Sequence, residues 1–237
     1  MSEALIKLVN VVKKYDTNSE EITVLDGLNL GMFEGEFVAI MGPSGSGKTT
    51  ILNLIAGIDG TTDGQIFVGP DEISAMTEGE LARWRSQHVG FIFQFYNLIP
   101  ALTAFENVEL PLLLSPLSKS ERREHVETAL EIVGLTDRSS FYPRQLSGGQ
   151  EQRVGVARAI VTDPTILLAD EPTGDLDAKS AGEILFLLEN LNKTFKKTIV
   201  MVTHDQNAAA RASRIIHLDK GLLRADVPMN NNQAISN

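Results

Sequence analysis

The stretch GPSGSGKTT, residues 42–50, constrains this 237-residue chain more than any other feature. It fits the pattern G-x-x-x-x-G-K-[ST], with Gly42, Gly47, Lys48 and Thr49 at the fixed positions. The run FVAIM before it is short, apolar and typical of a strand, and the segment after it has helical spacing. The sequence therefore predicts a strand, a glycine-rich loop and a helix, in this order.

A loop of this kind is suited to phosphate. Inward-pointing backbone N–H groups at the N-terminus of a helix bind anions, and the helix dipole adds positive potential there. Glycines keep the backbone accessible, Lys48 can reach the β- and γ-phosphates, and the Thr49 hydroxyl can bind Mg²⁺. An accidental glycine-rich turn is the competing interpretation, which the correct flanks make rare. The predicted ATP contacts of the loop are Gly42, Pro43, Ser44, Gly45, Ser46, Gly47, Lys48, Thr49 and Thr50.

Composition narrows the class of protein. Its hydrophobic residues (43%) and charged residues (22%) are typical of a globular, soluble chain with one sizeable core. We expect no membrane-spanning segment, because no apolar run approaches 18 residues, and no signal peptide. The absence of cysteine excludes disulfides and fits a reducing compartment. The formal charge of −10 disfavours binding to nucleic acid or, unaided, to an anionic membrane.

Strands are expected on both sides of the loop. Residues 4–12 alternate as a strand does, and residues 22–40 predict further strands joined by a tight turn. After the loop we expect a strand at 65–68, a polar helix through Trp84 and a buried strand at 89–94. We find no internal repeat.

Helices dominate the middle of the chain, from residue 95 to about 142. Thr103 with Glu106, and Ser118 with Glu121, predict capping boxes at the starts of two helices. We interpret this segment as a helical lobe inserted into the core. Its loop-like entrance, FYNLIP, packs four large apolar residues that either seed the core of the lobe or dock a partner.

A second anion site and a carboxylate pair follow. LSGGQ, residues 146–150, opens a helix with glycines and the Ser147 hydroxyl at its N-terminus. Residues 165–169 predict a buried strand that ends in Asp170 and Glu171, at the edge of a parallel sheet where ligands bind. Alone, this pair would be an ordinary exposed turn. Beside a phosphate loop, Asp170 is suited to Mg²⁺ coordination and Glu171 to polarising water.

The remainder alternates helix and strand. We expect a helix through residues 184–191, a buried strand at 198–202 followed at once by His204, and a last strand at 214–218. Residues 228–237 show no pattern, so we expect a disordered tail.

These motifs resemble those of the ATP-binding subunit of an ABC transporter over nearly all of residues 4–225. The matching segments are Gly42 to Thr49 for the Walker A loop, Gln94 for the Q-loop, Leu146 to Gln150 for the signature, Ile166 to Asp170 for the Walker B strand, Gly174 to Asp177 for the D-loop and His204 for the switch histidine. The resemblance implies an α/β fold: a P-loop NTPase with a RecA-like mixed sheet core and an N-terminal antiparallel β subdomain. One ATP-binding domain would span residues 1–227, with an α-helical subdomain inserted at about 95–160.

The resemblance also implies roles for individual residues. The catalytic residues would be Lys48, Glu171 and His204, and the Mg²⁺ ligands Thr49, Gln94 and Asp170. Tyr15, by itself an ordinary strand-end aromatic, would stack on the adenine, and Gln94 would contact the γ-phosphate. The family pairs head to tail around two ATP molecules, so a second copy would supply Ser147, Gly148, Gly149, Gln150 and Asp177.

A narrower resemblance points to the lipoprotein-release and macrolide-export branch. The strings that carry it are NLIAG (53–57), GFIFQF (90–95), ENVELP (106–111) and DEPTG (170–174). They imply a separate membrane permease, with or without a periplasmic adaptor, and export or extraction of a lipid, lipoprotein or hydrophobic compound from the cytoplasmic side of the inner membrane. The departures are small: Glu151 stands where glutamine is common, and Gly155 interrupts a helix at about 1 kcal/mol.

Other functions stay open at this point. A cell-division-type ATPase would signal through a permease-like partner without transport. An ATPase acting on nucleic acid or ribosomes is disfavoured by the acidic charge. A small-molecule kinase would lack LSGGQ.

Overall fold

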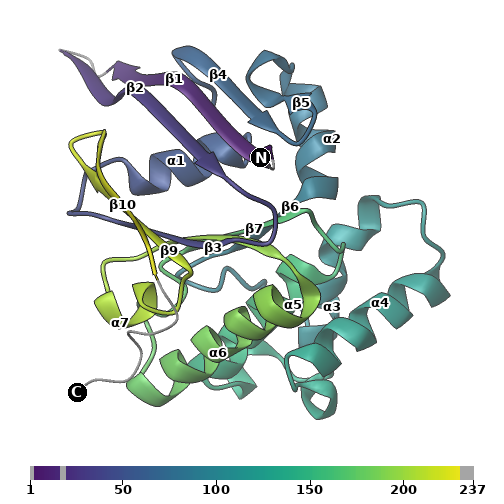
Figure 1. The fold of residues 1–237 in the computed structure, drawn as a ribbon. Helices are drawn as coiled ribbons and strands as arrows, with labels where there is room; N and C mark the ends of the chain where they lie inside the picture. Colours follow the sequence, from purple (N-terminus) through teal and green to yellow (C-terminus); the bar gives the residue numbers. More distant parts are fainter. Residues whose placement is uncertain (1–2, 17–19, 230–237) are drawn as a thin grey trace.

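Two sheets carry the chain in the computed structural model, which describes residues 3–16 and 20–229 (Figure 1). The antiparallel sheet has the order β2-β1-β4-β5 and the larger sheet the order β10-β9-β3-β8-β7-β6. Strands β9, β3, β8, β7 and β6 run parallel, and β10 is antiparallel to β9. The bounds are β1 Ile6–Asp16, β2 Glu21–Met32, β3 Phe37–Met41, β4 Asp63–Val68, β5 Asp71–Glu72, β6 Val89–Ile92, β7 Ile166–Asp170, β8 Thr198–Val202, β9 Arg214–Asp219 and β10 Leu222–Pro228.

The larger sheet separates two hydrophobic cores. In β3, Phe37, Ala39 and Met41 belong to one core, whereas Val38 and Ile40 belong to the other. The neighbouring strands β7 and β8 divide their residues in the same way. Because both faces of the sheet are covered, these strands read as continuous apolar runs in the sequence. The predicted α/β fold, with a mixed sheet and an N-terminal antiparallel sheet, is confirmed.

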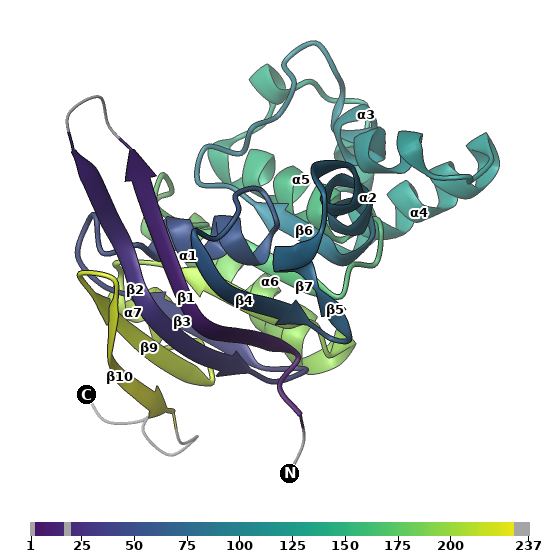
Figure 2. The ribbon, with the colours of Figure 1, turned by 90° about the horizontal axis from the view of Figure 1, so that it is seen from above.

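Helices cover both faces of this sheet. Helix α1 lies between the two sheets, whereas α5, α6 and the helical lobe lie against the opposite face (Figures 1 and 2). The bounds are α1 Lys48–Ile55, α2 Glu78–His88, α3 Ala104–Glu109, α4 Lys119–Ile132, α5 Gly148–Ile160, α6 Ala178–Phe195 and α7 Gln206–Ala209, with short 3₁₀ helices at Ile73–Ala75, Leu110–Leu114, Thr136–Arg138 and Pro143–Gln145. Within the described segments, no helix has both the length and the apolar character needed to cross a bilayer.

The helical lobe, inserted between β6 and β7, begins its helices at the predicted capping boxes. The Thr103 hydroxyl accepts from the Glu106 N–H at 3.2 Å, and the Glu106 carboxylate accepts from the Thr103 N–H at 2.8 Å. Ser118 and Glu121 repeat this exchange at the start of α4. Helix α4 then ends against Gly134, which takes a φ of 70°.

The C-terminal part of the chain differs from the sequence prediction. We expected the last strand at 214–218, but β10 follows it and pairs with β9 across a turn at Lys220 and Gly221. Pro228, the first residue of the expected tail, pairs with Arg214 in this hairpin. Strand β10 lies at the edge of the sheet and is mostly exposed, so its sequence lacks the apolar alternation that marks a half-buried strand. The expected disorder of residues 230–237 lies outside the described residues.

Candidate nucleotide site

The phosphate loop connects β3 to α1 and rests on the β9–β10 hairpin. A Cβ at Gly42 would lie 2.1 Å from the Leu218 carbonyl oxygen, so only glycine fits there. Gly47 caps α1 with a φ of 97°, which a residue with a side chain rarely adopts. The Gly221 N–H donates to the Ser46 carbonyl at 3.1 Å and ties the hairpin turn to the loop. The loop is therefore a tightly supported backbone cradle.

This cradle opens into a pocket of about 560 Å³, within the usual size range of ligand sites. The lining residues are Val24, Gly42, Pro43, Ser44, Gly45, Gly47, Lys48, Thr49, Thr50, Glu171 and His204. Ser46 does not line the pocket: its hydroxyl is buried without a hydrogen-bond partner, and its N–H donates to the Pro43 carbonyl. The ATP contact predicted for Ser46 therefore stays a prediction, because its side chain lies outside the lining and both of its backbone polar groups already have partners.

Lys48 lies at the centre of the loop. Its side chain is buried, and its ammonium group donates to the carbonyls of Gly42 and Pro43, both at 2.9 Å. These acceptors carry no formal charge, so the positive charge of Lys48 remains available to an anion. A glycine cradle at a helix N-terminus with a buried cation fits a polyphosphate.

Thr49 and Asp170 meet beside the loop. The Thr49 hydroxyl donates to an Asp170 carboxylate oxygen at 3.3 Å, across the junction of α1 and β7. Burial raises the pKa of Asp170 above its ordinary value, and the hydrogen bond from Thr49 opposes this shift. A cation would favour the charged carboxylate. A hydroxyl and a carboxylate are also oxygen ligands of the kind that Mg²⁺ prefers.

Glu171 and His204 converge because they follow neighbouring parallel strands, β7 and β8. His204 Nδ1 lies 2.9 Å from Glu171 Oε2, and both side chains line the phosphate pocket. The Glu171 N–H donates to the Val202 carbonyl at 2.9 Å, and Glu171 itself has a φ of 45°. This unusual backbone conformation turns the carboxylate toward the pocket, as is common at functional sites.

The signature motif LSGGQ caps helix α5 elsewhere on the molecule. The Ser147 hydroxyl accepts from the Gln150 N–H at 3.3 Å, and the Gln150 side chain accepts from the Ser147 N–H at 2.9 Å. Asp177 similarly caps α6 by accepting from the Lys179 and Ser180 N–H groups, both at 3.0 Å. None of Ser147, Gly148, Gly149, Gln150 or Asp177 lines the phosphate pocket.

Comparison with known proteins decides the family. Residues 25–174 match the family model described as ABC transporter. The chain belongs to the ABC transporter family, as an ATP-binding subunit. This ABC ATPase binds ATP, hydrolyses it and uses Mg²⁺. The prediction of family and enzyme class is confirmed.

Three relatives cover almost all of this ABC ATPase. The cassette MJ0796 of Methanocaldococcus jannaschii has been solved as a dimer in a post-hydrolysis state bound to ADP and Pi; it is 44% identical, with a TM-score of 0.87 over 95% of this chain and 99% of that one. The lipoprotein-releasing system ATP-binding protein LolD 1 of Chlorobium chlorochromatii is 41% identical over 100% of this chain and 97% of its own length. The macrolide export ATP-binding/permease protein MacB of Burkholderia thailandensis is 43% identical over 95% of this chain, which spans only 34% of that protein.

Gln94 and Tyr15 lie outside the lining of the pocket. Gln94 follows β6, and its side-chain nitrogen would lie 3.0 Å from a Cβ on Gly174. The Tyr15 hydroxyl donates to Asp59 at 2.7 Å, while the Lys13 ammonium lies 4.6 Å from its ring centroid. Burial, together with the hydrogen bond to Asp59, raises the pKa of Tyr15. The adenine-stacking role of Tyr15 therefore stays a prediction. The contacts with Asp59 and Lys13 hold the ring in place.

Sequence reasoning missed polar residues that support the site in this ABC ATPase. Gln152, in α5, donates to the Phe93 and Pro172 carbonyls at 3.1 and 2.6 Å. Arg158 donates to the carbonyls of Tyr96 and Asn97 at 2.7 and 2.6 Å. These contacts could have been suspected from the sequence, because a polar or charged residue on the buried face of an amphipathic helix needs a hydrogen-bond partner.

Proposed function

We propose that this ABC ATPase pairs with a second copy of itself around two ATP molecules and drives a separate membrane permease. The observation that carries this proposal is that the pocket of one chain lacks part of the expected ATP site. The pocket formed by one chain contains the Walker A loop, Glu171 and His204, whereas the signature motif lies outside it. The dimer solved for MJ0796 supports the pairing of two copies.

In the proposed dimer, each ATP lies between the phosphate loop of one chain and α5 of the other. Ser147, Gly148, Gly149 and Gln150 present backbone N–H groups, the Ser147 hydroxyl and a helix dipole to the γ-phosphate. Long-range repulsion between two chains of charge −10 is screened beyond about 8 Å, so closure depends on these local contacts. Loss of the shared γ-phosphate on hydrolysis would release them.

Residues that line the pocket and residues outside its lining have different proposed roles in hydrolysis. Lys48 holds the β- and γ-phosphates, and Thr49, Asp170 and Gln94 hold Mg²⁺, which neutralises charge on the phosphate oxygens. Glu171 orients and deprotonates the attacking water, and His204 contacts the γ-phosphate. The contact of 2.9 Å between His204 Nδ1 and Glu171 Oε2 keeps the two side chains together beside the pocket. Tyr15 stacks on the adenine, and Asp177 orders the contact between the two copies.

The proposed permease docks on the helical lobe. Large apolar side chains between β6 and α4 are exposed, among them Phe95 at 66%, Ile99 at 44% and Leu114 at 88%. Exposed apolar surface of this kind marks interaction sites. A permease would hold the chain at the cytoplasmic side of the inner membrane. The identity shared with LolD 1 and MacB supports export or extraction of a lipid, lipoprotein or hydrophobic compound, with or without a periplasmic adaptor.

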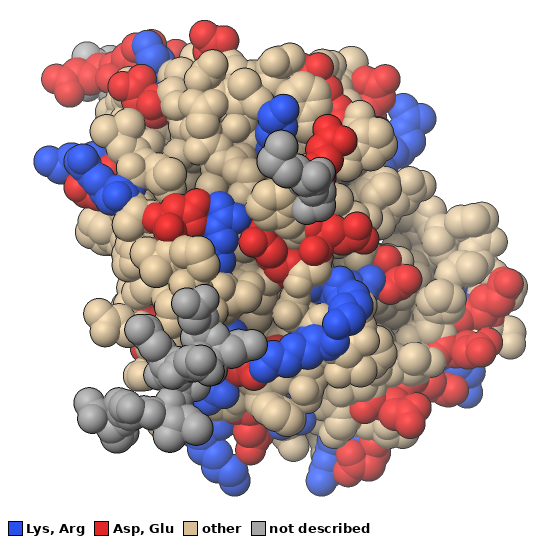
Figure 3. Space-filling model, in the orientation of Figure 1, with Lys and Arg blue, Asp and Glu red and all other residues tan. Residues whose placement is uncertain are grey.

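Nucleic acid is not among the proposed partners. Acidic and basic side chains are interspersed over the face shown in Figure 3, and the formal charge is −10. Nucleic-acid binding relies instead on a clustered basic surface.

We propose one ATP-binding domain over residues 1–227, with the helical subdomain at about 95–160.

Complementation between inactive variants tests the divided site. Lys48→Ala disables the phosphate loop, and Ser147→Arg blocks the signature face. Each variant alone should be inactive. A mixed dimer rebuilds one intact site from the loop of one chain and the signature of the other, so mixing should restore up to about a quarter of wild-type ATPase activity. Wild-type turnover by Ser147→Arg would refute the proposal.

A membrane pull-down with the tagged chain tests the partner. Recovery of a multispanning permease whose presence changes ATPase activity supports the proposal. Movement of a lipid or hydrophobic solute in reconstituted vesicles then separates transport from signalling through a permease-like partner. DNA- or RNA-stimulated turnover would contradict it.

A further inference from the structure

Gln152 links two loops that lie far apart in the sequence. It lies in α5, two residues after the signature motif, and its side chain is 0% exposed. Its amide nitrogen donates to the Phe93 carbonyl at 3.1 Å and to the Pro172 carbonyl at 2.6 Å. Phe93 immediately precedes Gln94, and Pro172 immediately follows Glu171. One side-chain amide thus joins both segments that carry proposed site residues.

The orientation of this amide follows from its partners. Both contacts are carbonyl oxygens, so the nitrogen, with its two N–H groups, must face them. The amide oxygen of Gln152 is buried and has no hydrogen-bond partner. A buried acceptor left without a partner costs about 1–3 kcal/mol. An apolar side chain of similar size would avoid this penalty but would take the shared donor away from the carbonyls of Phe93 and Pro172.

The two linked segments also touch directly. Strands β6 and β7 are parallel neighbours, so the chain leaves both at the same edge of the sheet. A Cβ on Gly174 would lie 3.0 Å from the Gln94 side-chain nitrogen, which shows how closely the segments pack. Glu171 holds a φ of 45°, and the bond from Gln152 fixes the carbonyl of the next residue. Loss of that bond would allow the Glu171 backbone to relax.

We propose that Gln152 is a positioning residue for ATP hydrolysis, which holds Gln94 and Glu171 in register with each other. The proposal rests on the functions proposed above for those two residues. A shift of the Gln94 segment passes through the shared amide to the segment that carries Glu171. Because Gln152 belongs to the signature helix, a shift of α5 moves both segments together.

Substitution with a side chain of similar length tests this link. Gln152→Met removes both donors and retains much of the packing volume, and Gln87→Met, on the exposed surface of α2, is the matched control. A misplacement of about 1 Å in a catalytic group costs about a hundredfold in rate. We expect Gln152→Met to lower kcat by about tenfold to a hundredfold, while KM for ATP changes by less than about twofold.

A double-mutant cycle separates positioning from packing. If Gln152 acts through Gln94, the variant with both Gln152→Met and Gln94→Ala should be no more than about threefold slower than the slower single variant. Losses that multiply both in this variant and in the variant with Gln152→Met and Glu171→Gln, or an unchanged kcat in Gln152→Met, would overturn the proposal. If Gln152→Met fails to fold, Gln152→Glu keeps the shape, loses at least one donor and should show the same selective loss of kcat. Wild-type rates in Gln94→Ala and Glu171→Gln would instead refute the roles assigned to those residues.

Discussion

Replacing Glu171 with glutamine should separate the rate of hydrolysis from the stability of the protein. The side chain lines the phosphate pocket, and its carboxylate lies 2.9 Å from His204 Nδ1. Glutamine has the same length and leaves the backbone bond from residue 171 to Val202 intact. The amide oxygen can accept from His204 in place of the carboxylate, but the amide cannot take a proton from water.

The expected magnitudes differ for the two quantities. A positioned general base contributes about 10² to 10⁴ in rate, or about 2.7 to 5.4 kcal/mol of barrier. In the contact with His204 a charged oxygen is replaced by a neutral one, so the free energy of unfolding should change by less than about 1 kcal/mol. Glu171→Gln should therefore turn over ATP at least about a hundredfold more slowly while its unfolding midpoint and ATP affinity stay close to wild type.

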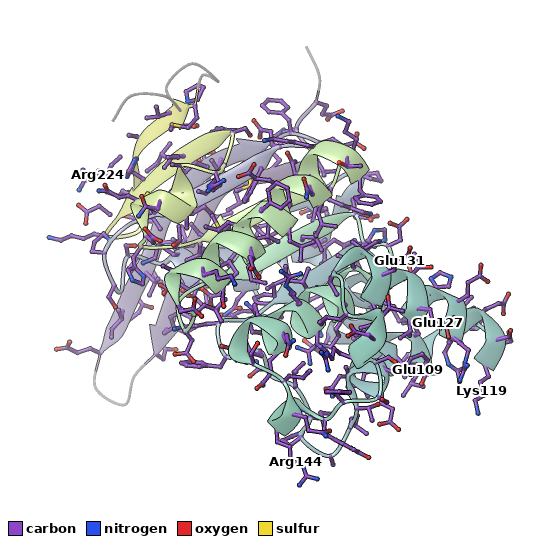
Figure 4. The ribbon with its side chains drawn as sticks, turned by 90° about the horizontal axis from the view of Figure 1, so that it is seen from below. Glu109, Lys119, Glu127, Glu131, Arg144 and Arg224 are labelled. Carbon is purple, nitrogen blue, oxygen red and sulfur yellow. The ribbon has the colours of Figure 1, made fainter. Side chains whose placement is uncertain are left out.

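Steady-state ATPase assays, thermal unfolding and light scattering measure these effects. Stalled hydrolysis should let ATP-bound dimers accumulate, and light scattering detects them. Glu127→Gln is the matched control: it makes the same charge change on α4, at the outer part of the helical lobe (Figure 4). Wild-type turnover in Glu171→Gln, or an equal loss in Glu127→Gln, would refute the reasoning.

Three further predictions follow from the structure. Burial raises the pKa of Asp170, so the stability that this group contributes is present below its ordinary pKa and is lost as pH rises through the raised value. Asp170→Asn should therefore raise the unfolding midpoint of the nucleotide-free protein at pH 7 and weaken its decline with rising pH, measured by calorimetry without Mg²⁺. A Cβ at Gly90 would lie 2.1 Å from a backbone carbonyl of α5, so Gly90→Ala should cost at least about 1–3 kcal/mol in urea unfolding. Gly79→Ala, in open space on α2, should not destabilise. Tyr15→Phe should keep ATP affinity because the ring remains, whereas Tyr15→Ala should weaken it about tenfold in a fluorescence titration; equal losses would show that the bond to Asp59 matters more than the ring.

The sequence predicted those parts of the fold whose information is local. A capping box needs only Thr103 and Glu106, three residues apart, and a phosphate loop needs only nine consecutive residues. The parallel strands were found because burial on both faces makes them continuous apolar runs. The rule that ligands bind at the carboxyl ends of such strands placed Asp170 and Glu171 at a ligand site, whereas the role of His204 came only from the resemblance to the family.

Contacts between distant segments could not be predicted in this way. Gln152 reaches Phe93 and Pro172, which lie 59 and 20 residues away, and Tyr15 reaches Asp59, 44 residues away. The periodicity of apolar residues along a sequence does not predict contacts between such distant residues. Strand β10 was missed because an exposed edge strand needs no apolar alternation. The positive φ of Glu171 was missed because tertiary contacts, rather than its residue type, impose that conformation.

The hydrogen bond between Gly221 and Ser46 limits how early the phosphate loop can fold while the chain is being synthesised. It joins the phosphate loop to a turn that follows 175 residues later (221 − 46). At about 5–20 residues per second, the ribosome releases the loop about 9–35 seconds before its support exists. A nascent chain therefore lacks the finished cradle for most of its translation. ATP can stabilise this part of the fold only near the end of synthesis.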